Sequence, residues 1–229
     1  MMSSQRARRL REWHEKALKP RREEPVTLTH LERTFVVPPE VYPPHPLGLA
    51  EIVLSEVRET DRVLDLGTGS GVNGIVAAAK SSDVVAVDVN PIAVECARQN
   101  AELNRVGSRI DVRESDLFEN VAGRFDLIVF DPPFRWFRPR DLLERGTADE
   151  NYETLRSFFR QAKDHLTADG RILLSFGTTG DIDYLRQLIG KAELDTEELR
   201  SVEGEKDGLA VAYFAHRLTD AGGAARRGG

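Results

Sequence analysis

Cysteine is almost absent from this sequence, and Cys96 is the only one. A single cysteine excludes an internal disulfide and a zinc site built from cysteines. Its position in an amphipathic helical stretch favours a packing role. The five histidines are scattered without the spacing of metal ligands, so we expect no metal. Long apolar runs are also missing, since none approaches the roughly 18 residues of a membrane span.

The N-terminal segment does not have the pattern of a signal peptide. The N-terminus has no apolar core of the signal-peptide type. We therefore expect a cytoplasmic protein with no membrane partner.

Positive charge is in short supply, with 32 Lys and Arg against 38 Asp and Glu and a net charge of −6. This balance argues against a protein that coats nucleic acid over its whole surface. The basic residues are unevenly placed, because the first 22 positions contain Arg6, Arg8, Arg9, Arg11, Lys16, Lys19, Arg21 and Arg22. Such a segment can steer an anionic partner, or it can be a solvated helix of mixed charge. Both interpretations stay open.

The chain divides into three parts by composition. Residues 1–45 form an expected N-terminal extension, made of a basic helix over 3–19, two short strands within 26–37 and a proline-rich lid. Residues 46–218 form the main domain, opened by a helix. Residues 219–229 are a glycine- and alanine-rich tail, which we expect to be disordered because it has few apolar groups to bury.

From residue 62 onward, apolar strands alternate with helices. The expected strands are 62–67, 83–89, 109–115, 125–131 and 170–177, with helices over 71–80, 90–104, 150–166 and 180–190. Two last strands within 194–217 are expected to form an antiparallel hairpin. The pattern predicts an α/β fold, a doubly wound Rossmann-like sheet of seven mostly parallel strands with helices on both faces.

A glycine-rich turn follows the first of these strands. It contains Asp65, Gly67, Thr68, Gly69 and Gly71. Glycine is needed where the backbone takes positive φ or approaches a ligand closely. The carboxyl end of a central strand is where open α/β sheets bind ligands.

The next strand ends in Asp88 and Val89, about 20 residues after the turn. A carboxylate there can accept both hydrogen bonds of a ribose diol. Gly69, Gly71 and Gly74 also match the dinucleotide fingerprint, so an NAD-binding oxidoreductase is an alternative. Asp65 favours S-adenosylmethionine (SAM) instead, because a carboxylate before the glycines suits a cationic ammonium and would repel a pyrophosphate.

The strand 125–130 runs directly into Asp131-Pro132-Pro133-Phe134. The prolines stiffen the loop, and a stiff loop suits an in-line displacement that depends on alignment. Asp131 and a proline carbonyl can accept hydrogen bonds from one NH₂ group, orient its lone pair and stabilise the positive charge that develops on nitrogen. Phe134 can stack on a planar group. This motif predicts methyl transfer to nitrogen.

The glycine turn, Asp88, Ser115-Asp116-Leu117 and the Asp-Pro-Pro-Phe loop resemble the motifs of class I SAM-dependent methyltransferases, across residues 46–217. The resemblance implies that the glycine loop holds the methionine part of SAM. It implies that Asp88 binds the ribose and that Asp116 binds the adenine amino group.

The tetrapeptide at 131–134 is similar to that of small-domain N-methyltransferases, among them the release-factor glutamine and the rRNA and tRNA base enzymes. The glutamine enzymes usually have Asn-Pro-Pro-Tyr, so Asp131 and Phe134 are departures. An ionised aspartate only accepts hydrogen bonds, which favours an exocyclic amine on a base slightly over a glutamine carboxamide.

The sequence therefore predicts SAM-dependent N-methylation of an amino or amide nitrogen on a planar acceptor, either a nucleobase of RNA or DNA or a protein glutamine. A small-molecule N-methyltransferase and a non-catalytic SAM-fold binding protein stay as alternatives. Interleaved basic and aromatic residues at 135–140 can grip nucleic acid, clamp an acidic protein loop or pack the loop. Tyr42 in the proline-rich segment is a candidate lid residue over SAM.

Overall fold

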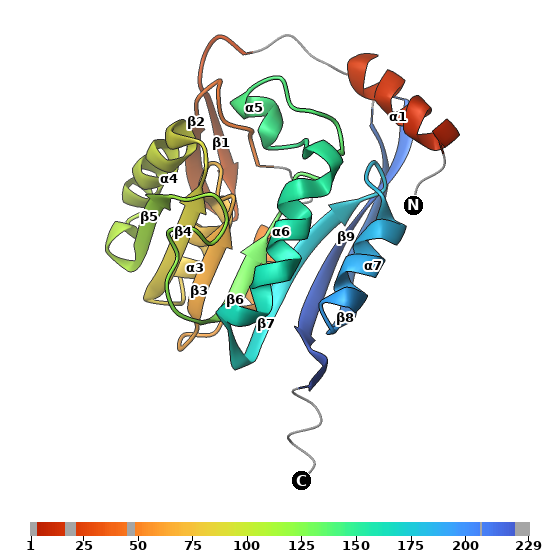
Figure 1. The fold of residues 1–229 in the computed structure, drawn as a ribbon. Helices are drawn as coiled ribbons and strands as arrows, with labels where there is room; N and C mark the ends of the chain where they lie inside the picture. Colours follow the sequence, from red (N-terminus) through yellow and green to blue (C-terminus); the bar gives the residue numbers. More distant parts are fainter. Residues whose placement is uncertain (1–3, 17–21, 45–48, 207, 223–229) are drawn as a thin grey trace.

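The computed structural model describes residues 4–16, 22–44, 49–206 and 208–222. Within these ranges, seven strands form one twisted sheet in the order β5-β4-β3-β6-β7-β9-β8 (Figure 1). β9 runs antiparallel to both of its neighbours, β7 and β8, and the other neighbouring pairs are parallel. The strands are β3 (Arg62–Leu66), β4 (Asp83–Asp88), β5 (Ile110–Glu114), β6 (Phe125–Phe130), β7 (Leu166–Gly177), β8 (Leu194–Lys206) and β9 (Leu209–Asp220).

Helices cover both faces of this sheet. One apolar core joins it to α2 (Ala50–Glu56), α3 (Val72–Ala78) and α4 (Pro91–Leu103). The other core joins it to α6 (Glu153–Gln161) and α7 (Ile182–Lys191). Successive side chains of β3 enter opposite cores, Val63 the first and Leu64 the second, and both are fully buried. Strands buried on both faces need continuous apolar runs, which explains the pattern in the sequence. The predicted doubly wound α/β fold is confirmed.

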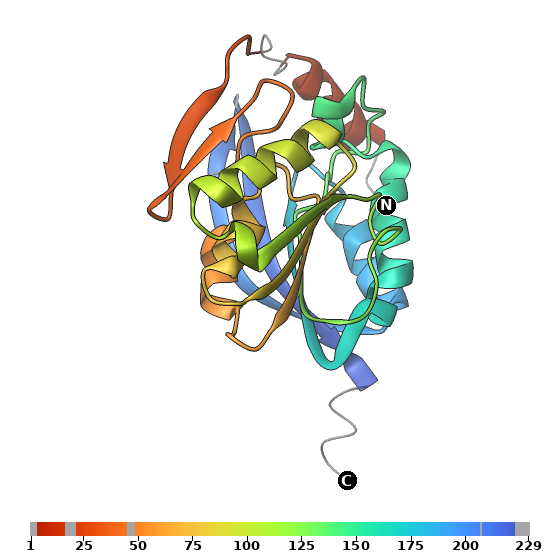
Figure 2. The ribbon, with the colours of Figure 1, turned by 90° about the vertical axis from the view of Figure 1, so that its left-hand side faces the viewer.

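The N-terminal strands β1 (Val26–His30) and β2 (Arg33–Val37) form an antiparallel hairpin beside α4 (Figure 2). Two asparagines of α4 hold the outer edge of β2. Asn100 accepts from the Val36 N–H at 2.9 Å and donates to its carbonyl at 3.1 Å, and Asn104 bonds Thr34 in the same way. Phe35 and Val37 enter the core that contains α4. The hairpin therefore shares its core with the large sheet.

The remaining helical segments are α1 (Ser4–Lys16) and four short ones: α5 (Leu142–Arg145), η1 (Gly107–Arg109), η2 (Glu150–Tyr152) and η3 (Ala162–His165). The helix predicted over 150–166 is wrong as one element. Asn151 and Tyr152 adopt φ of +54° and +59°, so the chain kinks before α6, and a 3₁₀ turn ends it. The sequence analysis did not predict α5.

The described ranges bear on two other expectations. Strand β9 extends to Asp220, two residues into the segment expected as a tail, and 223–229 lie outside the described residues. The proline-rich segment is described through Pro44, and the end of the expected helix 3–19 also lies outside the described residues. The division at 45 and 218 remains a prediction.

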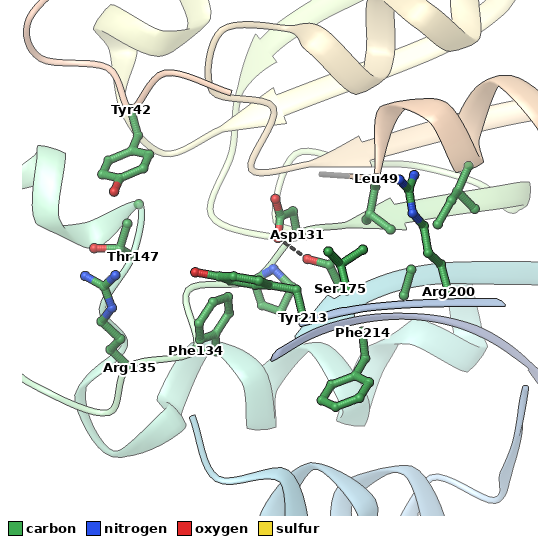
Figure 3. Close-up of a pocket in the computed structure, with 15 residues that line it drawn as sticks. Tyr42, Leu49, Asp131, Phe134, Arg135, Thr147, Ser175, Arg200, Tyr213 and Phe214 are labelled. Carbon is green, nitrogen blue, oxygen red and sulfur yellow. Dashed lines mark hydrogen bonds between the residues drawn. The ribbon is translucent and has the colours of Figure 1, made fainter. Parts of the chain in front are cut away.

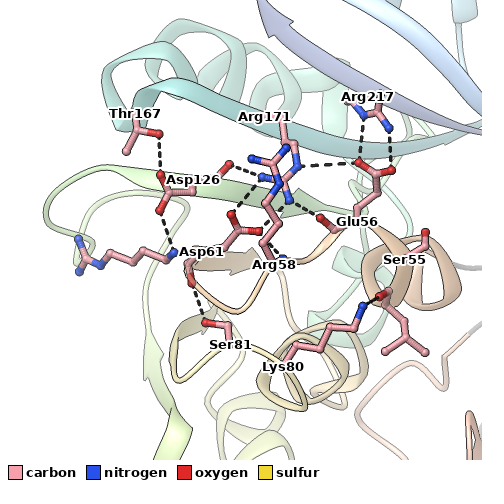
Figure 4. Close-up of polar contacts among 12 residues, drawn as sticks. Ser55, Glu56, Arg58, Asp61, Lys80, Ser81, Asp126, Thr167, Arg171 and Arg217 are labelled. Atoms are coloured by element: carbon pink, nitrogen blue, oxygen red, sulfur yellow. Dashed lines mark hydrogen bonds and ion pairs between the residues drawn. The ribbon is translucent and has the colours of Figure 1, made fainter.

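A buried polar network joins α2, β7 and β9 at the amino end of β3 (Figure 4). The Arg171 side chain is 5% exposed and pairs with Asp61 at 2.7 Å. It also donates to the carbonyls of Glu56 and Asp126. Arg217 grips the Glu56 carboxylate with two nitrogens, at 2.6 and 3.0 Å. The network therefore connects α2 to strands β7 and β9.

We expect Arg171→Met to lower the free energy of unfolding by about 3–5 kcal/mol, because it leaves the buried Asp61 carboxylate without its cation. Denaturant unfolding followed by circular dichroism measures this. The control is Arg186→Met, since Arg186 is 74% exposed and its ion pair within the described residues is with the exposed Asp183 in the preceding turn. Adding Asp61→Asn to Arg171→Met should restore part of the loss. Equal stability of the two single variants would contradict the role of the network.

Candidate active site

The predicted site residues come together at the carboxyl edge of the parallel strands. Leu66, the last residue of β3, is aligned with Val87 of β4 and with Phe130 of β6. Asp88 is aligned with Glu114 of β5. The glycine turn, Asp88, Ser115 and the Asp131 loop therefore leave the sheet side by side, as their positions after four strands predict.

The glycine turn takes the backbone conformation that requires glycine. Gly67, Gly69 and Gly71 have φ of +66°, +56° and +87°. At Gly71 a side chain would also meet the backbone of Ala97 at 3.1 Å, so this position has no room for a Cβ. The turn then leads into α3, with the Gly71 carbonyl accepting the Ile75 N–H at 2.9 Å.

Asp65 lies under this turn and is fully buried. Its Oδ2 accepts from the Thr68 hydroxyl at 2.6 Å and from the Gly74 N–H at 2.9 Å. Its Oδ1 is buried without a partner in the described residues. Burial raises the pKa of this carboxyl to about 7, opposed by the two hydrogen bonds. The structure thus gives Asp65 a role in holding the loop, and its attraction for an ammonium group stays a prediction.

Asp88 connects the turn to the end of β4. Its two carboxylate oxygens accept from the N–H groups of Gly69 and Asn90, each at 2.9 Å. Burial raises the pKa of the group, while the backbone hydrogen bonds and Arg145 act in the opposite direction. Each oxygen keeps a lone pair for a further donor.

Ser115, Asp116 and Leu117 make the turn after β5. The Ser115 hydroxyl donates to the Leu117 carbonyl at 3.0 Å and accepts the Asn120 N–H at 2.9 Å, which fixes Leu117 at φ +49°. The Asp116 carboxylate is half-exposed and accepts from Arg145 of α5 at 3.2 Å. Ser115 thus fixes the shape of the turn, and the turn exposes the side chain of Asp116.

A cavity opens above the glycine turn, and we call it the loop cavity. The predicted residues that line it are Gly67, Thr68, Gly69, Asp88, Val89, Ser115, Asp116 and Leu117. Asp65 and Gly71 lie behind this lining. Asn73 also lines the cavity, and its buried Oδ1 has no partner in the described residues. Leu142, Leu143 and Arg145 of α5 form its outer side.

A second cavity, the aromatic cavity, adjoins the first (Figure 3). Its lining includes Phe134, Tyr213 and Phe214 together with the cations Arg135 and Arg200. The two cavities have three lining residues in common: Tyr42, Asp131 and Gly146. Any pair of molecules held in the two cavities would therefore meet at Asp131.

Asp131 faces this junction, where its side chain is exposed to the two cavities. The Ser175 hydroxyl of β7 donates to Oδ1 (Figure 3). Desolvation by the protein around the cavities raises the pKa of the carboxyl, and the Ser175 hydrogen bond opposes that shift. Because no other hydrogen bond to this carboxylate is found among the described residues, Oδ2 can accept from a ligand.

Aromatic packing fixes the Asp-Pro-Pro-Phe loop. Phe134 packs on Phe176 with ring centroids 5.3 Å apart and meets the edge of Tyr213 at 6.3 Å. The Tyr152 hydroxyl donates to the Phe134 carbonyl at 3.1 Å and accepts the Asp181 N–H at 2.7 Å. A Cβ on Gly177 would lie 3.1 Å from the Phe134 ring, so glycine there permits the close approach.

Sequence reasoning missed several residues that the fold brings to the site: Tyr152, Ser175, Arg145, Arg200 and Tyr213. No motif marks them, since each reaches the site by a long-range contact. Tyr42, predicted as a lid residue, lines both cavities.

Among the residues that the structure describes, no group of three or more His, Cys, Asp or Glu side chains is placed to hold a metal ion. None of the helices in those ranges has the length and apolarity to cross a membrane.

The sequence profile of the methyltransferase small domain matches residues 35–198. The chain belongs to the methyltransferase small domain family. This finding confirms the resemblance to small-domain methyltransferases, and the match extends from β2 to β8. It includes the glycine turn, Asp88, Asp116 and the Asp131 loop.

Relatives within this group of methyltransferases support the same conclusion. A protein from Methanocaldococcus jannaschii that carries the name N5-glutamine methyltransferase is 46% identical over 98 residues, 42% of this chain and 48% of the relative. The release factor glutamine methyltransferase of Cereibacter sphaeroides is 34% identical over 162 residues, 63% of this chain and 57% of the relative. The chain therefore spans about half the length of these relatives.

Solved structures bear out the fold of this methyltransferase small domain protein. Methanocaldococcus jannaschii Trm5 in complex with adenosine has a TM-score of 0.66 and 20% identity, covering 88% of this chain and 57% of that chain. At this identity the likeness concerns the fold alone.

The raised pKa of Asp65 predicts how stability depends on pH. An acid whose pKa is higher in the folded than in the unfolded state stabilises the fold while it is protonated, and this contribution is lost when it ionises. Wild type therefore loses stability from this group as pH rises from about 4 to about 7. Asp65→Asn removes the charge and keeps an acceptor oxygen for Thr68 and Gly74. We expect the free energy of unfolding of the variant to exceed that of wild type. The difference should grow with pH, to about 4 kcal/mol at most by pH 8.

Urea unfolding of the two proteins at pH 5 and pH 8 measures this difference. Asp83→Asn, at the exposed start of β4, is the control and should match wild type at both pH values. A stability gap that is constant with pH would contradict the assignment to Asp65.

Proposed function

We propose that the protein is a SAM-dependent N-methyltransferase that transfers a methyl group to an amino or amide nitrogen of a planar acceptor. The observation that carries the proposal is the position of Asp131. Its carboxylate stands where the loop cavity meets the aromatic cavity. A methyl donor in the first cavity and an acceptor nitrogen in the second would meet at a hydrogen-bond acceptor.

The loop cavity suits SAM. Asp88, at the end of β4, keeps lone pairs for the hydroxyls of a ribose, and Asp116 can accept from an adenine amino group. Two buried oxygens beside the glycine turn, Asp65 Oδ1 and Asn73 Oδ1, lack partners in the described residues. Buried acceptors without donors are costly, so a ligand that brings an ammonium group or an ordered water fits this end of the cavity. When bound, SAM supplies an electrophilic methyl group.

The residues around the aromatic cavity can orient the acceptor nitrogen. With Ser175 on Oδ1, Oδ2 of Asp131 accepts an N–H of the acceptor and fixes the direction of the nitrogen lone pair. The negative carboxylate also stabilises the positive charge that develops on the nitrogen during transfer. Phe134 and Tyr213 offer aromatic faces to a planar group. We assign no general base, since the nitrogen can lose its proton after transfer.

The relatives favour a macromolecular acceptor. Two of them are named for glutamine methylation. In this chain Asp131 departs from the asparagine of such enzymes, and an aspartate favours an acceptor that brings donors, such as an exocyclic amine. An NAD-linked oxidoreductase is disfavoured, because the Asp65 carboxylate lies directly under the glycine turn, where it would repel a pyrophosphate. We place the enzyme in the cytoplasm.

The first test concerns the cofactor. Calorimetric titration of SAM into wild type and Asp88→Asn should show binding that weakens by about tenfold or more in the variant, because the ribose loses a charged acceptor. Asp83→Ala, on the same strand and 61% exposed, should bind SAM as wild type does. Binding of NAD in place of SAM by the wild-type protein would reject the proposal.

The second test concerns the acceptor. With labelled SAM and RNA, release factor or small amines as acceptors, Asp131→Ala should reduce methyl transfer by about 10²–10³-fold. The affinity for SAM should change by less than about threefold, since Asp131 acts on the acceptor nitrogen. Asp131→Asn keeps an acceptor oxygen and should retain more activity. A fall in SAM affinity equal to the fall in rate would place Asp131 in cofactor binding instead.

A further inference from the structure

Helix α1 folds back onto the segment that follows the Asp-Pro-Pro-Phe loop. Leu10 and His14 are its buried residues among those described. The His14 ring stacks on Phe137 with centroids 5.0 Å apart. Arg6 donates to the Thr178 carbonyl at 2.8 Å. The helix of mixed charge in the sequence is thus part of the wall beside the aromatic cavity.

Arg135 is the cation on this wall that faces the aromatic cavity (Figure 3). Its guanidinium lies 5.4 Å from the Trp13 ring centroid, and Nη1 is 3.3 Å from Nδ1 of His14. Burial lowers the pKa of His14, and the charge of Arg135 lowers it further, so at neutral pH the ring is uncharged and its nitrogen accepts from the guanidinium. Two aromatic side chains of α1 therefore fix the direction of Arg135.

This guanidinium has no carboxylate partner among the described residues. The other cations that line the two cavities do have one, since Arg200 pairs with Glu51 and Arg145 pairs with Asp116. The Nε of Arg135 is buried without any acceptor in the described part of the chain. A partly buried cation with unused donors is costly unless a ligand supplies the anion.

Two more arginines lie on the two segments that pack together at this wall. The Arg11 guanidinium, on α1, lies 5.5 Å from the centroid of the Phe137 ring. Arg138 directly follows Phe137; its side chain is 83% exposed and pairs with Glu150 at 3.8 Å. We call Arg135, Arg11 and Arg138 the arginine row.

We propose that the arginine row binds the phosphates of a single-stranded nucleic acid whose base enters the aromatic cavity. This inference rests on the proposed function, which assigns that cavity to the acceptor. Repeated phosphates match a row of cations, and a guanidinium binds phosphate with two parallel hydrogen bonds. Phe134 and Tyr213 supply the aromatic faces on which an unpaired base stacks. The carboxylates of an acidic protein loop could pair with the arginine row, but such a loop has no planar base to stack on Phe134 and Tyr213.

The test is fluorescence anisotropy with a labelled 20-nucleotide single-stranded RNA of mixed sequence, without SAM. We expect Arg135→Gln to bind at least tenfold more weakly and to reduce the slope of log affinity against log salt by about one. Arg138→Gln, at an exposed position where the fold does not depend on it, should weaken binding about threefold. Arg160→Gln is the matched control, because Arg160 is exposed at the far end of α6, and it should bind as wild type does.

Three outcomes would overturn the inference. They are the absence of RNA binding by the wild-type protein, a loss of affinity in the Arg160 variant equal to that of the Arg135 variant, and competition by poly-glutamate equal to that by unlabelled RNA. The last outcome would point to an acidic protein. Calorimetry with SAM on the same samples separates the two proposals. If the protein binds SAM but not RNA, only the proposal for the arginine row is rejected. If it binds RNA through Arg135 but does not bind SAM, only the proposed SAM-dependent methyl transfer is rejected.

Discussion

The buried carboxylate of Asp65 is the constraint on which the cofactor side of the site depends. It lies one residue before the end of β3, under the glycine turn, and accepts from Thr68 within the turn and from Gly74 after it. Removing this group from water raises its pKa, so the ionised form is tolerated only because the hydrogen bonds offset part of the cost. The turn held in this way aims the Gly69 N–H at Asp88. One buried acid therefore connects the glycine turn to the residue at the end of the neighbouring strand.

The two edges of the sheet carry polar groups for different purposes. At the amino edge the charges are paired, because Arg171 contacts Asp61 at 2.7 Å and its Nε, which makes no hydrogen bond within the described chain, lies 3.8 Å from the Glu56 carboxylate. At the carboxyl edge, the oxygens of Asp65 and Asn73 and the Nε of Arg135 have no partners among the described residues. Unsatisfied groups lower stability in the free protein and raise the gain from binding a ligand that satisfies them. The amino edge is therefore suited to holding elements together, and the carboxyl edge to binding a ligand.

The sequence is informative where a local pattern determines the structure. Apolar runs identify the strands, and the strand ends predict that Asp88 and Asp131 lie at one edge. The sequence is uninformative where distant segments meet. Tyr152 has positive φ, and its hydroxyl bonds to Phe134 and Asp181, which lie 18 and 29 residues away. Ser175 is one polar residue in the apolar run 172–177, and its hydrogen bond to Asp131 depends on the pairing of β6 with β7.

The change from asparagine to aspartate at position 131 is best understood together with Arg135. A carboxylate offers the acceptor only hydrogen-bond acceptors, so an amide can donate its N–H groups to it but its oxygen finds no donor there. The donors at the aromatic cavity lie instead on Arg135, whose position is fixed by Trp13 and His14 of α1. In the proposed reaction, two separate side chains therefore bind the acceptor. Asp131, at the end of β6, binds its nitrogen, and Arg135, beside α1, binds its anionic group. Because α1 fixes only the second, its loss should alter which acceptor binds while leaving the geometry at Asp131 intact.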